Sequence, residues 1–314
     1  IVFGDWSSDV CSSDLMFNYS AFGLQIASEP ELHDLMPGNG TPDVIIRYGD
    51  VPEHLPEPIK GKGVAYELSE DRFLLRVPGV ARFLVNHGNE IVVDRATGTD
   101  DTDISLFIVN TPIGALLYQR GFLPMHASAI EVNGGCTLFT GVSGVGKSTI
   151  LASFHQHGYH VVADEICAIS LSGDGVPYVH PGMASTWLWR DVLDHFEKDV
   201  SDLKHRQNNP EKYRVPIDGR FYSMPLPLKR VYVLSTKNTP GIEIDEIKGQ
   251  DKFLPIRNNA YRYRIGKVIT NPVVSFTMQT SIGKHAIVKR TLRPDGKPNI
   301  DLLRELIIND LENG

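Results

Sequence analysis

The sequence predicts an α/β protein in which a smaller β-rich part precedes a part that alternates strands and helices. Residues 16–94 contain short apolar runs that are broken by Pro, Gly and Asn, a pattern that is typical of β-rich folds. Residues 121–165 instead read as two strands, a Gly-rich loop, a helix and a further strand. We therefore expect a β-rich domain over residues 16–120, ending in a helix, and an α/β domain over residues 121–314.

The first domain is expected to contain several strands and a helical ending. Residues 87–90, HGNE, predict a turn between two of the strands. Residues 99–121 read as helical, because acidic residues in the first turn suit the helix dipole and Gly121 suits a helix end. The predicted strands are DVIIRYG (43–49), RFLLRVPG (72–79), ARFLVNHG (81–88) and NEIVVDR (89–95).

The second domain is expected to begin with a hairpin. MHASAIEV (125–132) and GCTLFTG (135–141) read as strands, and Asn133-Gly134-Gly135 between them is a hairpin signal. Residues 148–157 then read as a helix that ends before Gly158, and YHVVAD (159–164) reads as the next strand. Further elements are predicted as a helix in WRDVLDHFEKDV (189–200), a buried strand in LKRVYVLS (228–235) and an amphipathic helix over 300–313 with Leu302, Leu303, Leu306 and Ile307 on its apolar face.

The composition excludes some classes of protein. A formal net charge of −7 and a pI near 5.9 give no support to nucleic-acid binding. No apolar run approaches the roughly 18 residues of a membrane span, and no secretory signal is recognised at the start. The three cysteines, Cys11, Cys136 and Cys167, form no CxxC pair and no disulfide framework. We therefore expect a cytoplasmic protein without a membrane partner.

Residues 1–15 stand apart from the rest of the sequence. The stretch DWSSDVCSSDL, residues 5–15, resembles the in-frame translation of a short-read sequencing adapter, and Met16 follows it. The alternative is a disordered polar leader. Neither interpretation gives the segment a function, so it takes no part in the fold that we predict.

The segment GVSGVGKS, residues 141–148, matches the phosphate-binding pattern G-x-x-x-x-G-K-[ST] between a strand and a helix. Glycines let backbone N–H groups approach phosphate oxygens, and the start of the helix adds its positive dipole end. Lys147 is expected to contact the β- and γ-phosphates, and the Ser148 hydroxyl to ligate Mg²⁺. The alternative is an accidental Gly-rich turn. The predicted nucleotide-binding residues are Gly141, Val142, Ser143, Gly144, Val145, Gly146, Lys147, Ser148 and Thr149.

The nucleotide is expected to be ATP. The sequence contains no N-K-x-D or T-K-x-D guanine motif, because TKNT at residues 236–239 lacks the aspartate. No signature of the ABC type is present either, which speaks against a transport ATPase.

Asp164 and Glu165 are predicted to lie beside the phosphate loop. The helix runs back from the loop by roughly 15 Å, and the following strand returns by roughly 16 Å. A right-handed crossover would set this strand parallel to residues 136–140 in one sheet. Carboxylates at that point can hold Mg²⁺ or accept a proton from an acceptor hydroxyl. The alternative is a carboxylate pair that merely ends a strand.

His126 is predicted to lie at the same level. It stands at the open end of the predicted hairpin, across from Gly141, because the two strands run antiparallel. A histidine at this position can orient an acceptor or move a proton, and the alternative is a purely structural side chain. Of the basic residues Lys212, Arg214 and Arg230, one can clamp phosphate, although a solvated face is the simpler interpretation.

Together these residues resemble the HPr kinase/phosphorylase family. The matching pieces are His126, the segment 141–148 and VVADE, which ends at Glu165. The family has a histidine at the same spacing before its loop lysine, and it carries VADD where this chain has VADE. The resemblance implies that Glu165 accepts the proton, that Asp164 supports the metal or the base, and that Ser148 ligates Mg²⁺. It also implies the P-loop fold that the family shares with phosphoenolpyruvate carboxykinases.

The sequence departs from the family pattern at two places. Glu165 replaces an aspartate, so the proton acceptor reaches one methylene further. The second family signature, an E-x-R-G-L-G-type segment that supplies another metal ligand, is not visible, and residues 180–191 read HPGMASTWLWRD instead. PGMASTWLW, EKYRVP and PLPLKRVYVL look more like divergent HPr-kinase-like proteins, some of which phosphorylate precursors of ribosomal peptides such as lasso peptides.

The resemblance implies an ATP- and Mg²⁺-dependent kinase that phosphorylates a serine hydroxyl of a small protein or peptide. Its catalytic residues would be Glu165, Asp164, His126 and Lys147, and its metal ligands Ser148 and Asp164. Two alternatives stay open at this point. One is a kinase for a small molecule such as free serine, and the other is an ATP-binding regulatory module without turnover. Members of the family also form homo-oligomers.

Overall fold

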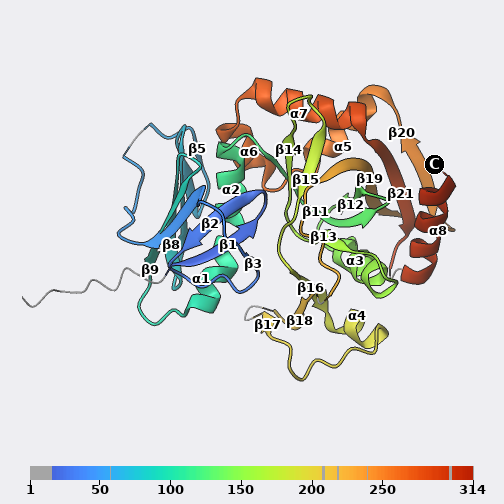
Figure 1. Ribbon diagram of the computed structural model, residues 1–314, viewed down its shortest axis with the longest axis horizontal. Coiled ribbons are helices and arrows are strands. Elements are labelled where there is room, and N and C mark those ends of the chain that lie inside the picture. The colour runs from blue at the N-terminus through green and yellow to red at the C-terminus, as the bar shows by residue number, and fades with distance from the viewer. Residues whose placement is uncertain are drawn as a thin grey trace, which may run out of the picture.

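The computed structural model shows a mixed α/β fold with several sheets (Figure 1). It describes residues 16–56, 58–206, 209–217, 219–238, 240–296 and 299–313. The two interpretations of residues 1–15 lie outside the described residues. The division into domains at residues 120 and 121 stays a prediction.

The first sheet is built from residues 17–95. Within the described residues it has nine strands, and it includes the four that the sequence predicts. The turn at HGNE joins two of them, with φ of 48° at His87 and 70° at Gly88. From one edge to the other the strands are β3 (Met36–Pro37), β1 (Phe17–Ala21), β2 (Leu24–Ser28), β4 (Val44–Tyr48), β9 (Glu90–Arg95), β8 (Ala81–Asn86), β7 (Arg72–Val77), β6 (Tyr66–Leu68) and β5 (Gly61–Lys62).

The helical segment after this sheet consists of two helices rather than one. Asp100 caps the start of helix α1 (Asp101–Ile108), because its side chain accepts a hydrogen bond from the backbone N–H of Asp103. Helix α2 (Thr111–Gln119) starts anew, with Pro112 in its first turn. Proline has no N–H to donate and is therefore tolerated only near a helix start. The prediction of continuous helix over residues 99–121 is therefore wrong at this break.

The second sheet also has nine strands within the part of the chain that the structure describes. The predicted hairpin is confirmed as β11 and β12, and the strand after the loop helix lies on the far side of β11. Along the sheet the order is β10 (Leu123–Met125), β14 (Cys167–Leu171), β15 (Pro177–His180), β19 (Leu226–Lys237), β12 (Gly135–Gly141), β11 (Ala127–Val132) and β13 (Val161–Ala163), while β21 (Ile287–Pro294) pairs with β19 and β20 (Glu243–Ile247) pairs with β21.

Strand β12 lies at the centre of this sheet. All seven of its residues are buried, as the continuous apolar run GCTLFTG indicates. It pairs parallel with β19 on one side and antiparallel with β11 on the other. Strand β13 pairs antiparallel with β11, so β12 and β13 point in the same direction in one sheet, as predicted, with β11 between them.

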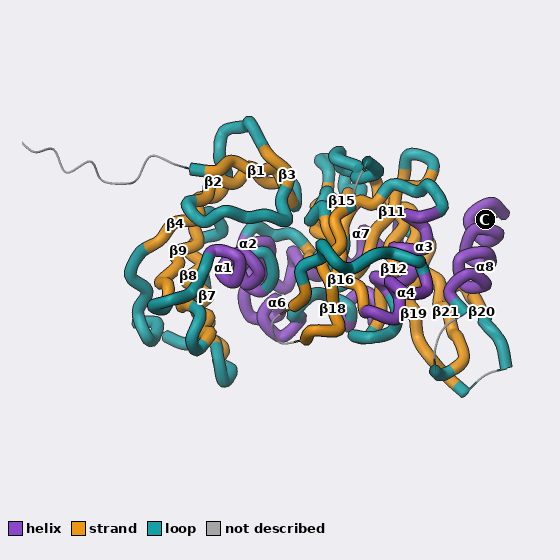
Figure 2. The backbone as a smooth tube through the Cα atoms, turned by 90° about the horizontal axis from the view of Figure 1, so that it is seen from below, coloured by secondary structure: helices purple, strands orange, loops and turns teal. Residues whose placement is uncertain are grey.

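A small third sheet lies below the second one in Figure 1 and is seen from below in Figure 2. Its order is β16 (Ser185–Trp189), β18 (Asn209–Pro216) and β17 (His205–Arg206). Helix α4 (Arg190–His195) follows β16 and is shorter than the helix that is predicted over residues 189–200. One side of β16 and β18 packs Leu188 and Val215 against Ala152 of the loop helix.

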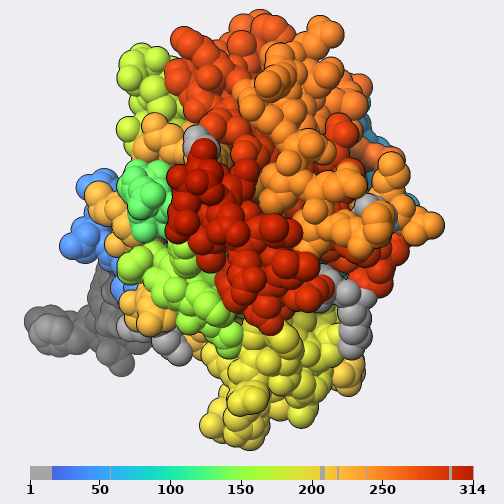
Figure 3. Space-filling view, turned by 90° about the vertical axis from the view of Figure 1, so that its right-hand side faces the viewer, coloured from blue at the N-terminus to red at the C-terminus, as the bar shows by residue number. Residues whose placement is uncertain are grey.

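Most of the remaining helices pack against the second sheet, whereas α6 packs against α2 and β6. Helix α3 follows the Gly-rich loop, as predicted, and α8 packs against it, which Figure 3 shows as dark red atoms beside green ones. Leu303 and Ile307 of α8 are buried as expected, whereas Leu302 is 43% exposed and lies outside the apolar face. The helices are α3 (Lys147–Gln156), the 3₁₀-helix η1 (Gly249–Lys252), α5 (Phe253–Asn258), α6 (Tyr263–Ile269), α7 (Pro272–His285) and α8 (Ile300–Asn313).

One hydrophobic cluster connects the first sheet with the second. It contains Phe73 and Phe83 from the first sheet, and also Ile166, Ala168 and Met183 from the second part of the chain. Helices α2 and α6 lie between the two sheets in both Figure 1 and Figure 2. In the described ranges, no helix is long and apolar enough to cross a membrane.

Candidate active site

Three glycines shape the loop between β12 and α3. Gly141, Gly144 and Gly146 have φ of +146°, +82° and +104°, values that other residues rarely adopt. A Cβ atom at Gly141 would lie 2.4 Å from the carbonyl oxygen of Leu234 in β19. Glycine is therefore required where β12 ends against its neighbour. The side chain of Val145 packs into the core and anchors the loop before the helix begins.

Lys147 is the first residue of α3 and is 7% exposed. Its Nζ donates hydrogen bonds to the carbonyl oxygens of Gly141 at 3.0 Å and Val142 at 3.2 Å. Burial lowers the pKa of Lys147, and the carboxylates of Glu165 and Asp164 act in the opposite direction. The ammonium group is thus held at the loop, within electrostatic reach of both carboxylates.

The register of β11 with its two neighbouring strands brings three segments close together. Ala127 at the start of β11 pairs with Thr140 near the end of β12. Ala129 pairs with Ala163, the last residue of β13. His126, which precedes β11, therefore lies level with Gly141, which ends β12, and the residue that follows β13 lies level with Ser128, two positions further along the chain.

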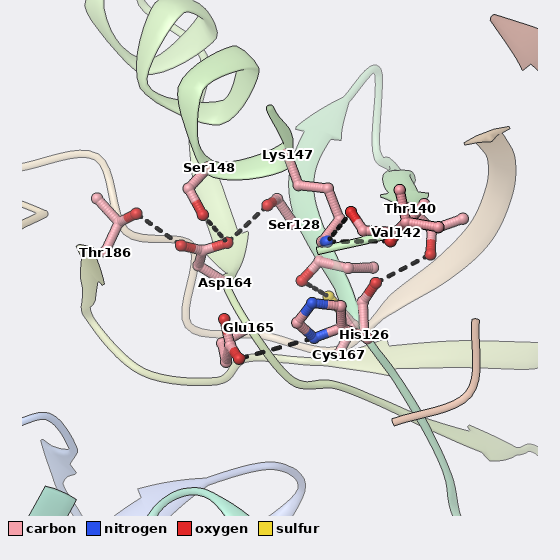
Figure 4. Close-up of polar contacts among 12 residues, drawn as sticks. His126, Ser128, Thr140, Val142, Lys147, Ser148, Asp164, Glu165, Cys167 and Thr186 are labelled. Carbon is pink, nitrogen blue, oxygen red and sulfur yellow. Dashed lines mark hydrogen bonds and ion pairs between the residues drawn. The ribbon is translucent and has the colours of Figure 1, made fainter. Parts of the chain in front are cut away.

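The residue after β13 is Asp164, which is 3% exposed and accepts three hydrogen bonds from hydroxyl groups. Ser128 and Ser148 donate to Oδ1 at 2.6 Å and 3.2 Å, and Thr186 donates to Oδ2 at 2.6 Å. Burial raises the pKa of Asp164, while the hydroxyl donors stabilise the carboxylate and oppose that rise. Both carboxylate oxygens are therefore fixed in direction (Figure 4).

Glu165 has an unusual backbone for its type. Its φ is +66°, and the N–H of Ile166 donates to the carbonyl of Asp164 at 2.8 Å, which closes a three-residue turn around Glu165. A non-glycine residue in this region costs roughly 1–3 kcal/mol and persists only where its surroundings hold it. The turn directs Glu165 toward His126, and the His126 Nδ1 to Glu165 Oε1 distance is 3.7 Å.

His126 is held from two sides. Its backbone N–H donates to the carbonyl of Asn259 at 2.8 Å, and the Thr140 hydroxyl donates to its carbonyl at 2.9 Å. Its ring lies 5.9 Å from the ring of Tyr261, measured between centroids. Burial lowers the pKa of His126, and the carboxylate of Glu165 partly opposes this shift. The neutral imidazole is therefore favoured, which leaves one ring nitrogen able to accept a proton.

The structure brings the residues predicted for catalysis and for the metal to one place. His126, Lys147, Ser148, Asp164 and Glu165 come from three chain segments that meet at the ends of β11, β12 and β13 (Figure 4). The other residues predicted to bind the nucleotide form the loop itself, with Val142, Ser143 and Gly144 exposed at its tip and Thr149 in the first turn of α3.

The donors near Ser148 fit a hard cation. The Ser148 hydroxyl and the Asp164 carboxylate lie 3.2 Å apart, so both oxygens can face one small ion. Mg²⁺ prefers such oxygen ligands and usually binds through one or two carboxylates, with water and substrate phosphates as further ligands. Among the described residues no cluster of three or more His, Cys, Asp or Glu could form a metal site made of protein ligands alone.

Sequence reasoning missed three residues of the site. Ser128 lies two positions after His126, and alternation along the strand predicted over residues 125–132 could have placed both on one side. Thr186 and Tyr261 approach from distant segments, so no local pattern identifies them. Of the basic residues weighed as phosphate clamps, Arg214 pairs with Asp34, whereas the charge of Lys212 is near enough to lower the pKa of Lys147.

Comparison with known proteins finds similarity to HPr kinases. The HPr kinase/phosphorylase of Chlorobaculum tepidum is 29% identical over 130 residues, which are 38% of this chain and 35% of the relative. The resemblance to HPr kinase/phosphorylase is confirmed. The match spans about a third of that relative's length. No family model matches the chain. The solved HPr(Ser) kinase/phosphatase from Coxiella burnetii aligns with 13% identity and a TM-score of 0.30, over 60% of this chain and 89% of that one.

Proposed function

We propose that this protein is an ATP- and Mg²⁺-dependent kinase that transfers the γ-phosphoryl group to a serine hydroxyl of a small protein or peptide. One observation carries the proposal, namely the meeting of Lys147, Asp164, Glu165 and His126 at the ends of three neighbouring strands. The second sheet would then be a P-loop domain of the type shared by HPr kinase and phosphoenolpyruvate carboxykinase.

The loop and α3 would hold the phosphates of ATP. Backbone N–H groups in a Gly-rich loop and at the start of a helix favour anions, and α3 begins directly after Gly146. The ammonium group of Lys147 would leave the loop carbonyls of Gly141 and Val142 and contact the β- and γ-phosphates. The burial of Lys147 strengthens this attraction, because a charge is screened less away from water.

Ser148 and Asp164 would hold the metal ion. The ion would neutralise the charge of the phosphate oxygens that it contacts. Asp164 is suited to this role because its three hydroxyl partners stabilise the ionised carboxylate in a buried position. The carboxylate would thus be available to a cation without needing to reorient.

Glu165 would accept the proton of the acceptor hydroxyl. As the acceptor oxygen forms its bond to the γ-phosphorus, the bond to the bridging oxygen of ADP breaks and the hydroxyl proton moves to the carboxylate. Neutral His126, 3.7 Å from Glu165, would orient the acceptor and accept the proton from Glu165 afterwards. Positioning and electrostatics supply most of the catalysis in such reactions.

Labelled ATP with Mg²⁺ tests the proposal when it is offered in parallel to HPr, to a ribosomal precursor peptide and to free serine. We expect label on a serine of a polypeptide. Lys147→Ala should abolish ATP binding and transfer. Glu165→Gln should keep ATP binding and lower transfer by roughly 10²- to 10⁴-fold. Lys248→Ala and Glu246→Gln, at exposed positions outside the site, serve as matched controls.

Three outcomes would contradict the proposal. Phosphoryl transfer at the wild-type rate in Lys147→Ala or Glu165→Gln would contradict the role assigned to that residue. Label on free serine but on no polypeptide would select the small-molecule kinase. ATP binding with no transfer to any acceptor would favour the regulatory module.

A further inference from the structure

The hydroxyl group that holds Asp164 Oδ2 comes from outside the sheet that carries the phosphate loop. Thr186 belongs to β16 in the three-stranded sheet, and its hydroxyl lies 2.6 Å from the carboxylate. Side chains that hydrogen-bond to a metal-binding group orient it, and their loss typically costs 10- to 100-fold in metal affinity or activity. The position of β16 therefore determines whether Thr186 can orient Asp164 at the proposed metal site.

Strand β16 is fixed by a residue from the first part of the chain. The carbonyl of Asp34 accepts a hydrogen bond from the N–H of Ala184 at 3.0 Å. The Asp34 carboxylate accepts from the hydroxyl of Ser185 and from the guanidinium of Arg214, which belongs to β18. Arg214 donates a further bond to the carbonyl of His33 at 2.7 Å.

Asp34 thus contacts two neighbouring strands, namely β16, which carries Thr186, and β18, which carries Arg214. Its side chain is 7% exposed, and Arg214 is its charged partner. Ser185 and Thr186 are consecutive residues, so their side chains point to opposite faces of β16. On one face of β16, Ser185 donates a hydrogen bond to Asp34. On the other face, Thr186 donates a hydrogen bond to Asp164.

We propose that Asp34 is a positioning residue for the metal-binding carboxylate, and that it acts through β16 and Thr186 on Asp164. The inference rests on the proposed function. It gives the first part of the chain a defined task in the site, which is to fix the strand whose hydroxyl orients Asp164.

The affinity of the full chain for Mn²⁺ in the presence of ADP, measured by electron paramagnetic resonance, tests this inference. Thr186→Val should weaken Mn²⁺ binding by about 10- to 100-fold, and Thr186→Ser, which keeps the hydroxyl, should restore it. Asp34→Asn should weaken it by about tenfold. The affinity for ADP without metal should stay unchanged in all of these variants, because they leave the loop and Lys147 intact.

Two further variants separate positioning from general stability. Ser185→Ala removes one contact of Asp34 but keeps its pair with Arg214, so it reports on Mn²⁺ affinity even where Asp34→Asn does not fold. Thr291→Val is the matched control, because Thr291 is 1% exposed in β21 and its hydroxyl has no hydrogen-bond partner within the described residues. It should leave Mn²⁺ affinity unchanged.

A double variant tests whether the two residues act in series. If Asp34 acts through Thr186, Asp34→Asn combined with Thr186→Val should bind Mn²⁺ no more weakly than Thr186→Val alone. Unchanged affinity in both Asp34→Asn and Ser185→Ala, or losses that multiply in the double variant, would overturn the inference and leave the proposed function standing. A wild-type protein that binds neither ADP nor Mn²⁺ would overturn both.

Discussion

Glu165 offers a prediction in which stability and activity change in opposite directions. Its φ of +66° is unfavourable for a glutamate and is tolerated by asparagine and glycine. Glu165→Asn should therefore relieve backbone strain and also remove the carboxylate proposed as the proton acceptor. Glu165→Gln is the matched variant, because it removes the carboxylate and leaves the strain in place.

The size of the stability gain follows from the backbone. The left-handed conformation costs an L-residue roughly 1–2 kcal/mol, and asparagine recovers part of this cost. We expect Glu165→Asn to be about 1 kcal/mol more stable than the wild type. That gain corresponds to a rise in Tm of about 1–2 °C for a chain of this length.

Urea unfolding followed by tryptophan fluorescence gives the stability, and transfer from labelled ATP gives the activity. Both Glu165 variants should lose transfer by roughly 10²- to 10⁴-fold, and only Glu165→Asn should shift the urea midpoint upward at an unchanged slope. A midpoint for Glu165→Asn at or below that of the wild type would refute the assignment of strain. Transfer at the wild-type rate would refute the assignment of the base.

Two further predictions concern the loop and the first sheet. Gly141→Ala should lower stability by about 3–5 kcal/mol, because the new Cβ meets the Leu234 carbonyl at 2.4 Å, whereas Gly144→Ala, with nothing within 4 Å, should cost only about 1–2 kcal/mol. Equal urea midpoints for these two variants would contradict this. In the first sheet, His54 and other donors lower the pKa of Glu67 to about 2, from 4.5. The resulting stabilisation, at most about 3 kcal/mol, is present above pH 4.5 and is lost as the pH falls toward 2. The difference in unfolding free energy between wild type and Glu67→Gln should therefore be largest at pH 7 and fall to about half or less at pH 3, and an equal difference at both would contradict the shift.

The central part of the candidate site could be predicted because its determinants are local in the sequence. Gly134 and Gly135 specify a tight hairpin, and the antiparallel register then places His126 level with Gly141. The loop helix and the five residues 159–163 that follow it, of which 161–163 form β13, span similar distances, so the chain returns to the same edge of the sheet at Asp164. Each step depends on residues that are near one another in the chain.

The rest of the site depends on tertiary contacts that no local pattern encodes. Thr186 and Tyr261 reach the site from strands and turns that are far along the chain, and Asp34 contacts β16 across a separation of about 150 residues. In the first sheet, β5 and β3 have two residues each, which is too short for a recognisable alternation. The break between α1 and α2 was foreseeable from Pro112, because proline rarely occurs inside a helix.

The hydrophobic cluster that joins the first sheet to the second limits how the chain can move and be divided. Ile166, Ala168 and Met183 are 0%, 0% and 3% exposed because residues of the first sheet and its helices cover them. A fragment that starts at residue 121 would present this apolar surface to water, so it should aggregate rather than refold alone. For the same reason the two sheets should not open about a hinge.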